Sequence, residues 1–446
     1  MRIGLVGDGG REHAIAEALT QGDSASTLCA YMHNSNPGIV ARAEAIELGS
    51  MTDVGRITGF FRRTRPDLIL IGPEAPLVAG VVDALTACGL AAIGPTGAQA
   101  RLESDKGYMR QLMCKRIGRG YPDFLETRDL SEVSAFISAH QGQVVVKPVG
   151  LTGGKGVRVL GTNLTDLEEA LPYAGKLIQQ NGRVLMEERL DGEEFSLMVS
   201  SDGNHVVPMP LAQDFKCVYD GDQGGMTGGM GAYTCADGRL PFITEAEFQT
   251  ALELVREVLA AVQDETQQPY RGVLYGQFML TAEGPLIVEC NVRFGDPEAI
   301  NVLAVLQDDL GDILGRVVKG SLAGVAFRAS ATVSKYLVPS GYPEASQSDV
   351  FFHLDLPGLK EQSLEVRFAS VRSTDDGYWT ASSRTFALLA LADTPGEASD
   401  RIERAIAALA LDGLHHRRDV GDREVLAAKA CHMERIRESQ GKELFA

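Results

Sequence analysis

The sequence has little positive charge. It holds 42 lysine and arginine residues against 60 aspartate and glutamate residues, which gives a formal net charge of −18. Such a chain is not expected to bind nucleic acid or an anionic membrane through its overall charge. It also lacks an apolar run of membrane-spanning length. We therefore predict no nucleic-acid partner and no membrane partner, although an anionic substrate needs only a local group of lysines and arginines.

Cysteine is sparse and irregularly spaced. The seven cysteines show no paired spacing, which argues against a zinc framework and suits a reducing compartment. No signal peptide is recognisable, because the chain opens directly into an apolar segment and a glycine turn. These absences predict a cytoplasmic protein. A length of 446 residues with 44% hydrophobic residues predicts two or three globular domains.

The most informative segment follows the apolar stretch 285–288, which predicts a buried strand. Glu289 and Asn291 are two residues apart, so on a strand their side chains leave the same face. A carboxylate and an amide oxygen aimed together form a hard-oxygen site suited to Mg²⁺. Arg293 continues this face if the strand persists, and its planar guanidinium can bind a phosphate or a carboxylate.

A second strand is predicted just upstream, at 274–280. A turn at 282–284 would join the two strands as a hairpin. That pairing would bring Gln277 close to Glu289 as a further oxygen ligand. The alternative is an ordinary strand end with scattered polar residues, which spacing alone favours because such pairs are common on strands.

The N-terminus combines an apolar strand, 3–6, with a glycine turn, 7–10, and an amphipathic helix pattern. This order can place a phosphate on free backbone N–H groups at the start of the helix. The dinucleotide fingerprint fails, because its third glycine would fall at Glu12. A mononucleotide or a sugar phosphate fits better. The alternative is a glycine turn that serves only backbone geometry.

Strand and helix patterns alternate through about residue 100, which predicts a small doubly wound domain. The stretch 66–74 predicts a buried strand that ends in a polar loop, and 91–95 predicts a further short strand. Ligands gather at the carboxyl ends of parallel strands. Glu74 is therefore either a carboxylate that faces a ligand or a charge at the start of a helix.

A glycine-rich loop, 150–156, follows the predicted strand 143–148 and precedes the strand 157–160. The glycine and hydroxyl spacing of a phosphate-binding P-loop is absent. Strand, loop and strand instead suggest a lid over phosphates, with backbone N–H groups and lysines as donors. A plain glycine-rich hairpin is the alternative. It leaves unexplained why Lys147 lies in an apolar strand, where an unpaired charge is costly.

Other elements can be assigned from caps and periodicity. Helices are predicted to start at 104–106, at 129–132, at 165–168 with Thr165 as the cap, and at 394–397. Strands are predicted at 184–190, 195–199, 331–338 and 385–391. The segment 221–231 is predicted to be a second glycine-rich loop, and 424–446 a charged helix on the surface.

Taken together, these segments resemble the phosphoribosylamine–glycine ligase family, also called glycinamide ribonucleotide synthetases, of the ATP-grasp superfamily. The matching segments occur in the family's order, at 7–14, 72–78, 153–157, 213–214, 227–231, 291–298 and 417–419. The combination of 291–298 with 228–231 is highly specific. The chain departs from the common family pattern at 34–38, 215–217, 224–227 and 382–383.

The resemblance implies an α/β and α+β fold with three parts. The first is an N-terminal doubly wound parallel-sheet domain, 1–102, which binds phosphoribosylamine. The second is an ATP-grasp domain, 103–328, with a lid subdomain at about 118–192. The third is a small C-terminal α+β domain, 329–446.

The resemblance also implies roles for individual residues. Nucleotide contacts are expected from Lys106, Lys147, Gly153, Gly154, Lys155, Gly156, Glu187, Glu188 and Glu194. Metal ligands are expected at Gln277, Glu289 and Asn291. Catalytic groups are expected at Asp214, Arg293 and Asp296, and substrate contacts at Gly9, Gly10, Glu74, Gly229, Gly231, Arg293 and Lys335.

The implied reaction joins glycine to 5-phosphoribosylamine at the expense of ATP, through glycyl phosphate, in purine biosynthesis. It requires Mg²⁺ or Mn²⁺, with two ions expected, and the chain is expected to be a monomer or a weak homodimer. One rival is another ATP-grasp ligase or carboxylase that acts on a different ribonucleotide. A rival of another class is a non-catalytic nucleotide-binding regulator, which would need a broken metal site or missing lysines.

Overall fold

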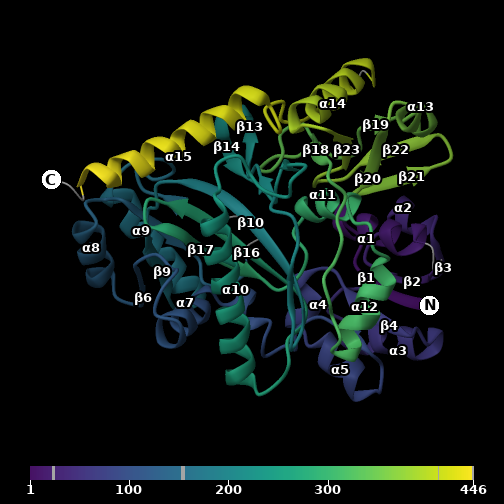
Figure 1. Ribbon diagram of the computed structural model, residues 1–446, viewed down its shortest axis with the longest axis horizontal. Coiled ribbons are helices and arrows are strands. Elements are labelled where there is room, and N and C mark those ends of the chain that lie inside the picture. The colour runs from purple at the N-terminus through teal and green to yellow at the C-terminus, as the bar shows by residue number, and fades with distance from the viewer. Residues whose placement is uncertain (23–25, 152–155, 410, 444–446) are drawn as a thin grey trace.

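A computed structural model describes residues 1–22, 26–151, 156–409 and 411–443 (Figure 1). The N-terminal region forms a parallel sheet in the order β3-β2-β1-β4-β5. Its strands are β1 (Arg2–Val6), β2 (Thr27–Met32), β3 (Ala43–Leu48), β4 (Leu68–Ile71) and β5 (Ala92–Ile93). Its helices are α1 (Gly10–Gln21), α2 (Pro37–Val40), α3 (Val54–Thr64), α4 (Glu74–Val78) and α5 (Val81–Ala87). The predicted doubly wound parallel sheet is confirmed.

The central region is built on an antiparallel sheet in the order β11-β10-β16-β17. Its strands are β10 (Glu193–Asp202), β11 (Val206–Pro208), β16 (Arg271–Thr281) and β17 (Gly284–Asn291). The helices of this region are α6 (Arg101–Ser104), α7 (Lys106–Arg116), α10 (Glu245–Thr266), α11 (Glu298–Ala304) and α12 (Leu310–Lys319). The long helix α10 starts at a capping box in which Thr244 and Glu247 satisfy each other's backbone N–H groups.

A second antiparallel sheet, in the order β6-β9-β7-β8, lies within the range predicted for the lid. Its elements are β6 (Phe124–Thr127), α8 (Leu130–Ala139), β7 (Val144–Lys147), β8 (Arg158–Val159), α9 (Leu167–Asn181) and β9 (Val184–Glu188). This part has an apolar core of its own, with buried members between Val133 and Met186. The predicted cap of α9 was wrong by one residue: the Asp166 carboxylate accepts from the Glu169 N–H, while the Thr165 N–H donates to the Glu169 side chain.

The main C-terminal sheet has the order β12-β15-β18-β23-β20. Its strands are β12 (Gln213–Asp214), β15 (Gly231–Thr234), β18 (Ala331–Pro339), β20 (Leu364–Phe368) and β23 (Phe386–Ala392), with β24 (Leu414–His415) beside β18. The strands β19 (Phe351–Phe352), β21 (Val371–Thr374) and β22 (Gly377–Thr380) form a small sheet, and the helices are α13 (Leu356–Glu361), α14 (Pro395–Leu409) and α15 (Arg423–Glu443). Because β12 and β15 precede the predicted boundary at 328, this sheet ties the central region to the C-terminal one.

Two further predictions need correction. The glycine-rich segment 221–231 is not a continuous loop, because β14 (Gln223–Met226) pairs with β13 (Cys217–Tyr219) across the short 3-10 helix η1 (Asp220–Asp222). Glycine has a low strand propensity, so composition hid a strand that backbone pairing supports. The terminal helix α15 is not wholly superficial, since Leu426 and Met433 are buried in the main core.

Two large apolar cores each mix residues from the N-terminal, central and C-terminal regions. These regions therefore pack as one body around the pocket described below, while the lid range keeps its separate core. Within the described residues, none of the helices combines the length and the apolar character needed to cross a membrane.

Candidate active site

A polar pocket of about 230 Å³ opens where the N-terminal, central and C-terminal regions meet. Both signs of charge line it closely, which suits anionic reactants held beside a cation. Its charged and amide side chains are Arg11, Glu74, Glu103, Lys106, Asp214, Lys216, Glu289, Asn291, Arg293, Asp296, Glu298 and Arg384. Seven residues predicted from the sequence are in that set: Glu74, Lys106, Asp214, Glu289, Asn291, Arg293 and Asp296.

The hairpin β16–β17 places the predicted metal-binding residues together. Gln277 is the register partner of Glu289, as the predicted turn at 282–284 required. Asn291 lies two residues along the same strand, and its Nδ2 donates to Glu289 Oε1 at 3.3 Å. Burial alone would raise the pKa of Glu289, but the ammonium groups of Lys216 and Lys106 outweigh burial and lower it. The carboxylate is therefore ionised at neutral pH.

This donor set fits a magnesium ion that also binds substrate phosphates. Among the described residues, no three histidine, cysteine, aspartate or glutamate side chains surround a possible metal position. Mg²⁺ needs no such cage, because it is usually bound through one or two carboxylates, waters and phosphate oxygens. Glu289 and Asn291 supply the oxygens. Gln277 fits less well, because its Oε1 accepts from two hydroxyls, those of Ser196 and Tyr275, and it is not part of the pocket lining. Asn291 Oδ1 accepts from Arg293 and does line the pocket.

A group of carboxylates surrounds Lys216 beside the metal-binding residues. Lys216 Nζ lies 3.3 Å from Glu194 Oε2 and 3.7 Å from Asp214 Oδ2. Burial raises the pKa of Asp214 to about 7, and repulsion from Glu298, Glu194 and Glu289 adds to burial while Lys216 opposes it. Lys216 was not predicted from the sequence, because its segment departs from the family pattern.

A buried ion-pair network lies behind the nucleotide side of the pocket. Lys147 Nζ is 2.5 Å from Glu187 Oε2, and Arg110 Nε is 2.6 Å from Glu187 Oε1. Arg110 also donates to the carbonyls of Ile287 and Val288, both at 2.7 Å. Burial would raise the pKa of Glu187, but Arg110 and Lys147 lower it to about 2. The lysine in an apolar strand is therefore paired.

Three other residues predicted to contact the nucleotide, Lys106, Gly156 and Glu188, make hydrogen bonds within the protein. Lys106 begins α7 and donates through Nζ to the Gly150 carbonyl at 3.0 Å. The Gly156 carbonyl accepts from Tyr173 at 2.6 Å. Glu188 accepts from the Asp123 N–H at 2.8 Å. Gly153, Gly154 and Lys155 lie outside the described residues.

Arg293 forms an ion pair with Glu74, a residue that both begins a helix and lines the pocket. The guanidinium is 3.4 Å from Glu74 Oε2 and 2.9 Å from Glu103 Oε1, and it donates to Asn291 Oδ1 at 3.2 Å. Glu74 is the first residue of α4 and also lines the pocket. Glu103 was not predicted from the sequence, although it is nearly fully buried and holds both Arg293 and the Val292 N–H.

Two residues of the C-terminal region hold Asp296. Tyr336 donates its hydroxyl to Asp296 Oδ1 at 2.7 Å, and Arg384 Nη2 lies 2.8 Å from Asp296 Oδ2. Arg384 Nη1 also donates to the carbonyls of Gly228 and Gly229, at 2.7 and 3.0 Å. Gly229 has φ +106°, and a Cβ there would lie 2.5 Å from Pro297 Cδ. Arg384 was missed, although it stands next to Ser382 and Ser383, where the chain departs from the family.

The N-terminal glycine turn is tightly packed. The Gly9 N–H donates to Glu12 Oε2 at 2.8 Å, so a side chain of the same helix already occupies it. Glu12 is buried, and its Oε1 is 2.5 Å from Arg11 Nε. A Cβ at Gly10 would come within 2.0 Å of the Tyr336 hydroxyl. The sequence did not predict that the Glu12 carboxylate would accept from the Gly9 N–H.

Of the predicted substrate residues, Glu74 and Arg293 line the pocket, whereas Gly9, Gly10, Gly229, Gly231 and Lys335 are not part of its lining. Lys335 is fully buried, 2.7 Å from Glu403 Oε1, and it donates to the Arg418 carbonyl at 2.7 Å. Gly231 is its register partner on the neighbouring strand β15. Direct contact between either residue and a substrate stays a prediction.

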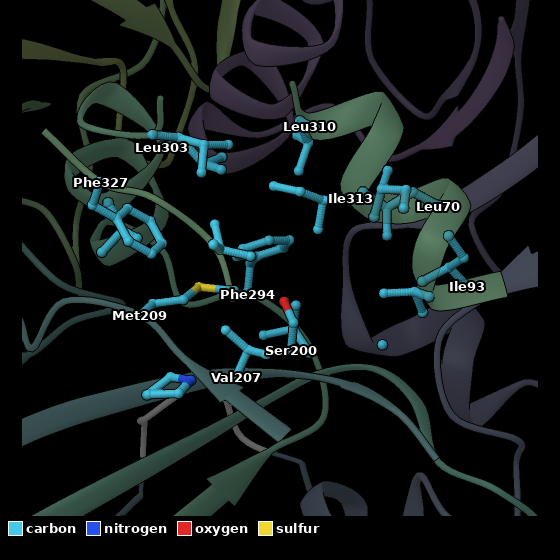
Figure 2. A pocket seen from close by; sticks show the side chains of 18 residues that line it. Leu70, Ile93, Ser200, Val207, Met209, Phe294, Leu303, Leu310, Ile313 and Phe327 are labelled. Carbon is cyan, nitrogen blue, oxygen red and sulfur yellow. The ribbon is translucent and has the colours of Figure 1, made fainter. Parts of the chain in front are cut away.

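A second cavity lies behind the loop that follows β17, and Figure 2 shows the side chains that converge on it. Leu70 and Ile93 come from the N-terminal sheet, Ile313 from α12 and Val207 from β11. Phe294, next to Arg293, also lines it. With a volume of about 20 Å³ and almost no polar lining, this cavity is unsuited to a phosphorylated substrate.

Comparison with known sequences and structures gives one family. The chain matches the N domain (1–103), the ATP-grasp (A) domain (104–299) and the C domain (332–423) of phosphoribosylglycinamide synthetase. A curated relative named phosphoribosylamine–glycine ligase, from Pyrococcus abyssi, is 44% identical over 98% of each chain. A relative of the same name from Methanothermobacter thermautotrophicus is 42% identical over 98% of this chain and 100% of its own.

Solved structures show the same fold. The crystal structure of phosphoribosylamine–glycine ligase from Thermotoga maritima matches with a TM-score of 0.78 and 26% identity, covering 94% of this chain and 100% of its own. A biotin carboxylase domain from Hydrogenobacter thermophilus matches with a TM-score of 0.71 at 15% identity, over 97% of this chain and 93% of its own, which shows the fold alone. On the matches over its whole length, the chain belongs to the phosphoribosylamine–glycine ligase family of ATP-grasp enzymes.

Proposed function

We propose that this protein ligates glycine to 5-phosphoribosylamine with ATP, giving glycinamide ribonucleotide, ADP and phosphate in purine biosynthesis. Family membership and the name shared by relatives over the whole chain support the reaction. One structural observation supports it most strongly. The ionised Glu289 and the Asn291 amide share a pocket with the cations Lys106, Lys216 and Arg293.

The proposed chemistry has two steps. In the first, a carboxylate oxygen of glycine attacks the γ-phosphorus of ATP, the bond to the β–γ bridging oxygen breaks, and ADP leaves from glycyl phosphate. In the second, the amine of phosphoribosylamine attacks the acyl carbon, the carbon–oxygen bond to phosphate breaks, and the amine loses a proton. Both steps bring anions together, so the protein must supply positive charge.

The cations of the pocket meet that need. Lys106, which lines the pocket, and Lys147 are assigned to the phosphates of ATP, and Lys147 would share its charge between Glu187 and the nucleotide. Arg293 is oriented by Glu74 and Glu103 and can bind the glycine carboxylate as a fork. Asp296, held by Tyr336 and Arg384, completes the wall next to it. Asp214 and Glu194 are assigned to the glycine and ribose contacts.

Mg²⁺ or Mn²⁺, when bound, would neutralise phosphate oxygens and align the γ-phosphate for attack. Glu289 and Asn291 would hold it, with Gln277 as a candidate further ligand and a second ion shared with the nucleotide. The lid range, 118–192, has its own core and can move as a unit to keep water from the acyl phosphate. Gly9 and Gly10 are assigned to the phosphate of phosphoribosylamine, which requires Glu12 to release the Gly9 N–H.

The direct experiment is ADP release with Mg²⁺-ATP and freshly generated phosphoribosylamine, with and without glycine. Release that needs both substrates, together with glycinamide ribonucleotide as the product, supports the proposal. Release without glycine would contradict it and point to another ATP-grasp ligase or carboxylase. A panel of other small carboxylic acids, and bicarbonate, then identifies the acid.

A further inference from the structure

The terminal helix α15 has no part in the chemistry proposed above. It begins where the match to the C domain ends, at residue 423. In Figure 1 it runs, in yellow, from the C-terminal region back across the top of the central sheet. It contacts β10 and β16. Tyr275 of β16 lines the pocket, and Glu194 of β10 pairs with the pocket residue Lys216. The helix α15 therefore packs against strands that lie next to the pocket.

One contact of α15 fixes the start of β10. Lys429 Nζ lies 2.8 Å from Glu193 Oε2, and His432 Nδ1 lies 2.8 Å from Glu193 Oε1. Successive side chains of a strand leave opposite faces. The next residue, Glu194, accordingly points to the other side, where it accepts from Gln277 at 2.9 Å and from Lys216 at 3.3 Å. A shift of Glu193 would move Glu194 with it.

The same lysine also contacts Phe215, the residue that follows Asp214 and the strand β12. Lys429 Nζ lies 5.7 Å from the centroid of the Phe215 ring, and the Arg417 guanidinium lies 4.8 Å from it, both within the range of a cation–π contact. Phe215 is buried, at 3% exposure. It stands between Asp214 and Lys216, which both line the pocket. One ammonium group therefore contacts both Glu193, at the start of β10, and Phe215, which lies between two pocket residues.

Arg437, on the same helix, makes a separate anchor. It pairs with Glu247 at 2.9 Å and donates to the Phe242 carbonyl at 2.7 Å. Glu247 lies in the first turn of α10, and among the described residues the hydrogen bonds and ion pairs of Arg437 go to Glu247 and the Phe242 carbonyl alone. Arg437 therefore anchors α15 to the start of α10, away from Glu193 and Phe215.

We propose that Lys429 is a positioning residue for the glycine and ATP subsites. Backbone hydrogen bonds between Ser196 and Ala212 already join the two segments. The Lys429 ammonium group adds a contact between Glu193 and Phe215, and so helps to set the positions of Glu194, Asp214 and Lys216. The inference rests on the proposed function, because the subsites are named by that reaction. It leaves the phosphoribosylamine subsite, built from the N-terminal region, unaffected.

The test compares three variants of the full chain. Lys429→Met keeps the side-chain length and removes the charge, Lys429→Arg restores the charge, and Arg437→Met removes the neighbouring anchor. We expect Lys429→Met to raise KM for glycine and for ATP about threefold to tenfold, with KM for phosphoribosylamine unchanged. Lys429→Arg should return both values to within about twofold of the parent protein, and Arg437→Met should leave all three unchanged.

Affinity for a non-hydrolysable ATP analogue, measured by calorimetry, tests the positioning role of Lys429 independently of the proposed ligase reaction. It should weaken in Lys429→Met by about the same factor as KM for ATP, even if glycine proves not to be the acid substrate. Unchanged affinity and unchanged KM values, with only a lower melting temperature, would overturn the positioning role. Equal effects of Lys429→Met and Arg437→Met would also overturn it, because they would show general loosening of the helix.

Discussion

The two sides of the pocket are built in different ways. On the side predicted to bind metal, the side chains of paired strands are expected to act, and Gln277, Glu289 and Asn291 lie together because strand register and alternation place them there. On the side expected to bind phosphoribosylamine, the backbone of a glycine turn is expected to act, and the Gly9 N–H of that turn is held by Glu12. A strand fixes the direction of its side chains, whereas the N–H groups of a glycine turn bind whichever acceptor reaches them, here the nearby Glu12.

The largest expected effect is on the strand-built side. Replacing Glu289 with Ala removes the only carboxylate among the three predicted metal ligands, so kcat should fall about 10³-fold or more. The fold should survive, because the Glu289 side chain is not part of an apolar core. Circular dichroism and steady-state turnover check the two parts of this expectation. Glu283→Ala, at the exposed turn of the same hairpin, is the matched control and should keep its activity.

The next largest effect is expected on the free energy of unfolding. It tests the buried Arg110 network, which contacts the strand β17. Arg110→Met would leave Glu187 with Lys147 as its one remaining ion-pair partner among the described residues, and it would remove the Arg110 hydrogen bonds to the Ile287 and Val288 carbonyls. Removing one partner of a buried pair costs about 3–5 kcal/mol of free energy of unfolding. Urea denaturation measures it. Arg116→Met, at an exposed position of the same helix, should change stability by less than about 0.5 kcal/mol. Equal losses in the two variants would contradict the network's importance.

The same network should respond to acid. The pKa of Glu187 is lowered to about 2 from an ordinary value of 4.5, so its stabilising contribution is fully present above the ordinary value and is lost as pH falls toward about 2. The gap in free energy of unfolding between the parent protein and Glu187→Gln should therefore shrink by about 2 kcal/mol between about pH 6 and about pH 3. Urea titrations at each pH measure the gap. A gap independent of pH would show that the carboxylate is not held by these cations.

The smallest expected effect tests the glycine turn. A Cβ at Gly9 would lie 2.8 Å from Glu12 Oε2 and displace that side chain. Gly9→Ala should raise KM for phosphoribosylamine about tenfold and leave KM for ATP unchanged. Gly55→Ala, where a Cβ meets only Asp53 at 3.7 Å, is the control. An unchanged KM for phosphoribosylamine would mean that the turn serves backbone geometry alone.

The sequence was most informative where local rules dominate. The apolar stretch before Glu289, the spacing to Asn291 and the short turn together predicted a hairpin and its register, which the structure confirms. Alternation of strands and helices predicted the parallel sheet of the N-terminal region. These features depend on neighbours within a few residues, so one sequence suffices to read them.

The remaining site residues depend on contacts between distant segments. Arg384 reaches Gly228 across 156 residues, and Glu103 reaches Val292 across 189. Nothing in the periodicity around Arg384 or Glu103 indicates these partners. The strand β14 was missed for a related reason, because its glycines gain strand structure only by pairing with β13. A departure from the family pattern, as at Ser382 and Ser383, was the one local signal near Arg384.

The most direct test of the account follows one oxygen atom. Glycine labelled with ¹⁸O in its carboxylate is supplied with Mg²⁺-ATP and phosphoribosylamine, and the released phosphate is analysed by mass spectrometry. If glycyl phosphate forms, each phosphate carries one ¹⁸O atom taken from glycine for every glycinamide ribonucleotide made. Unlabelled phosphate released alongside that product would contradict attack by the glycine carboxylate, and with it the proposed role of the pocket.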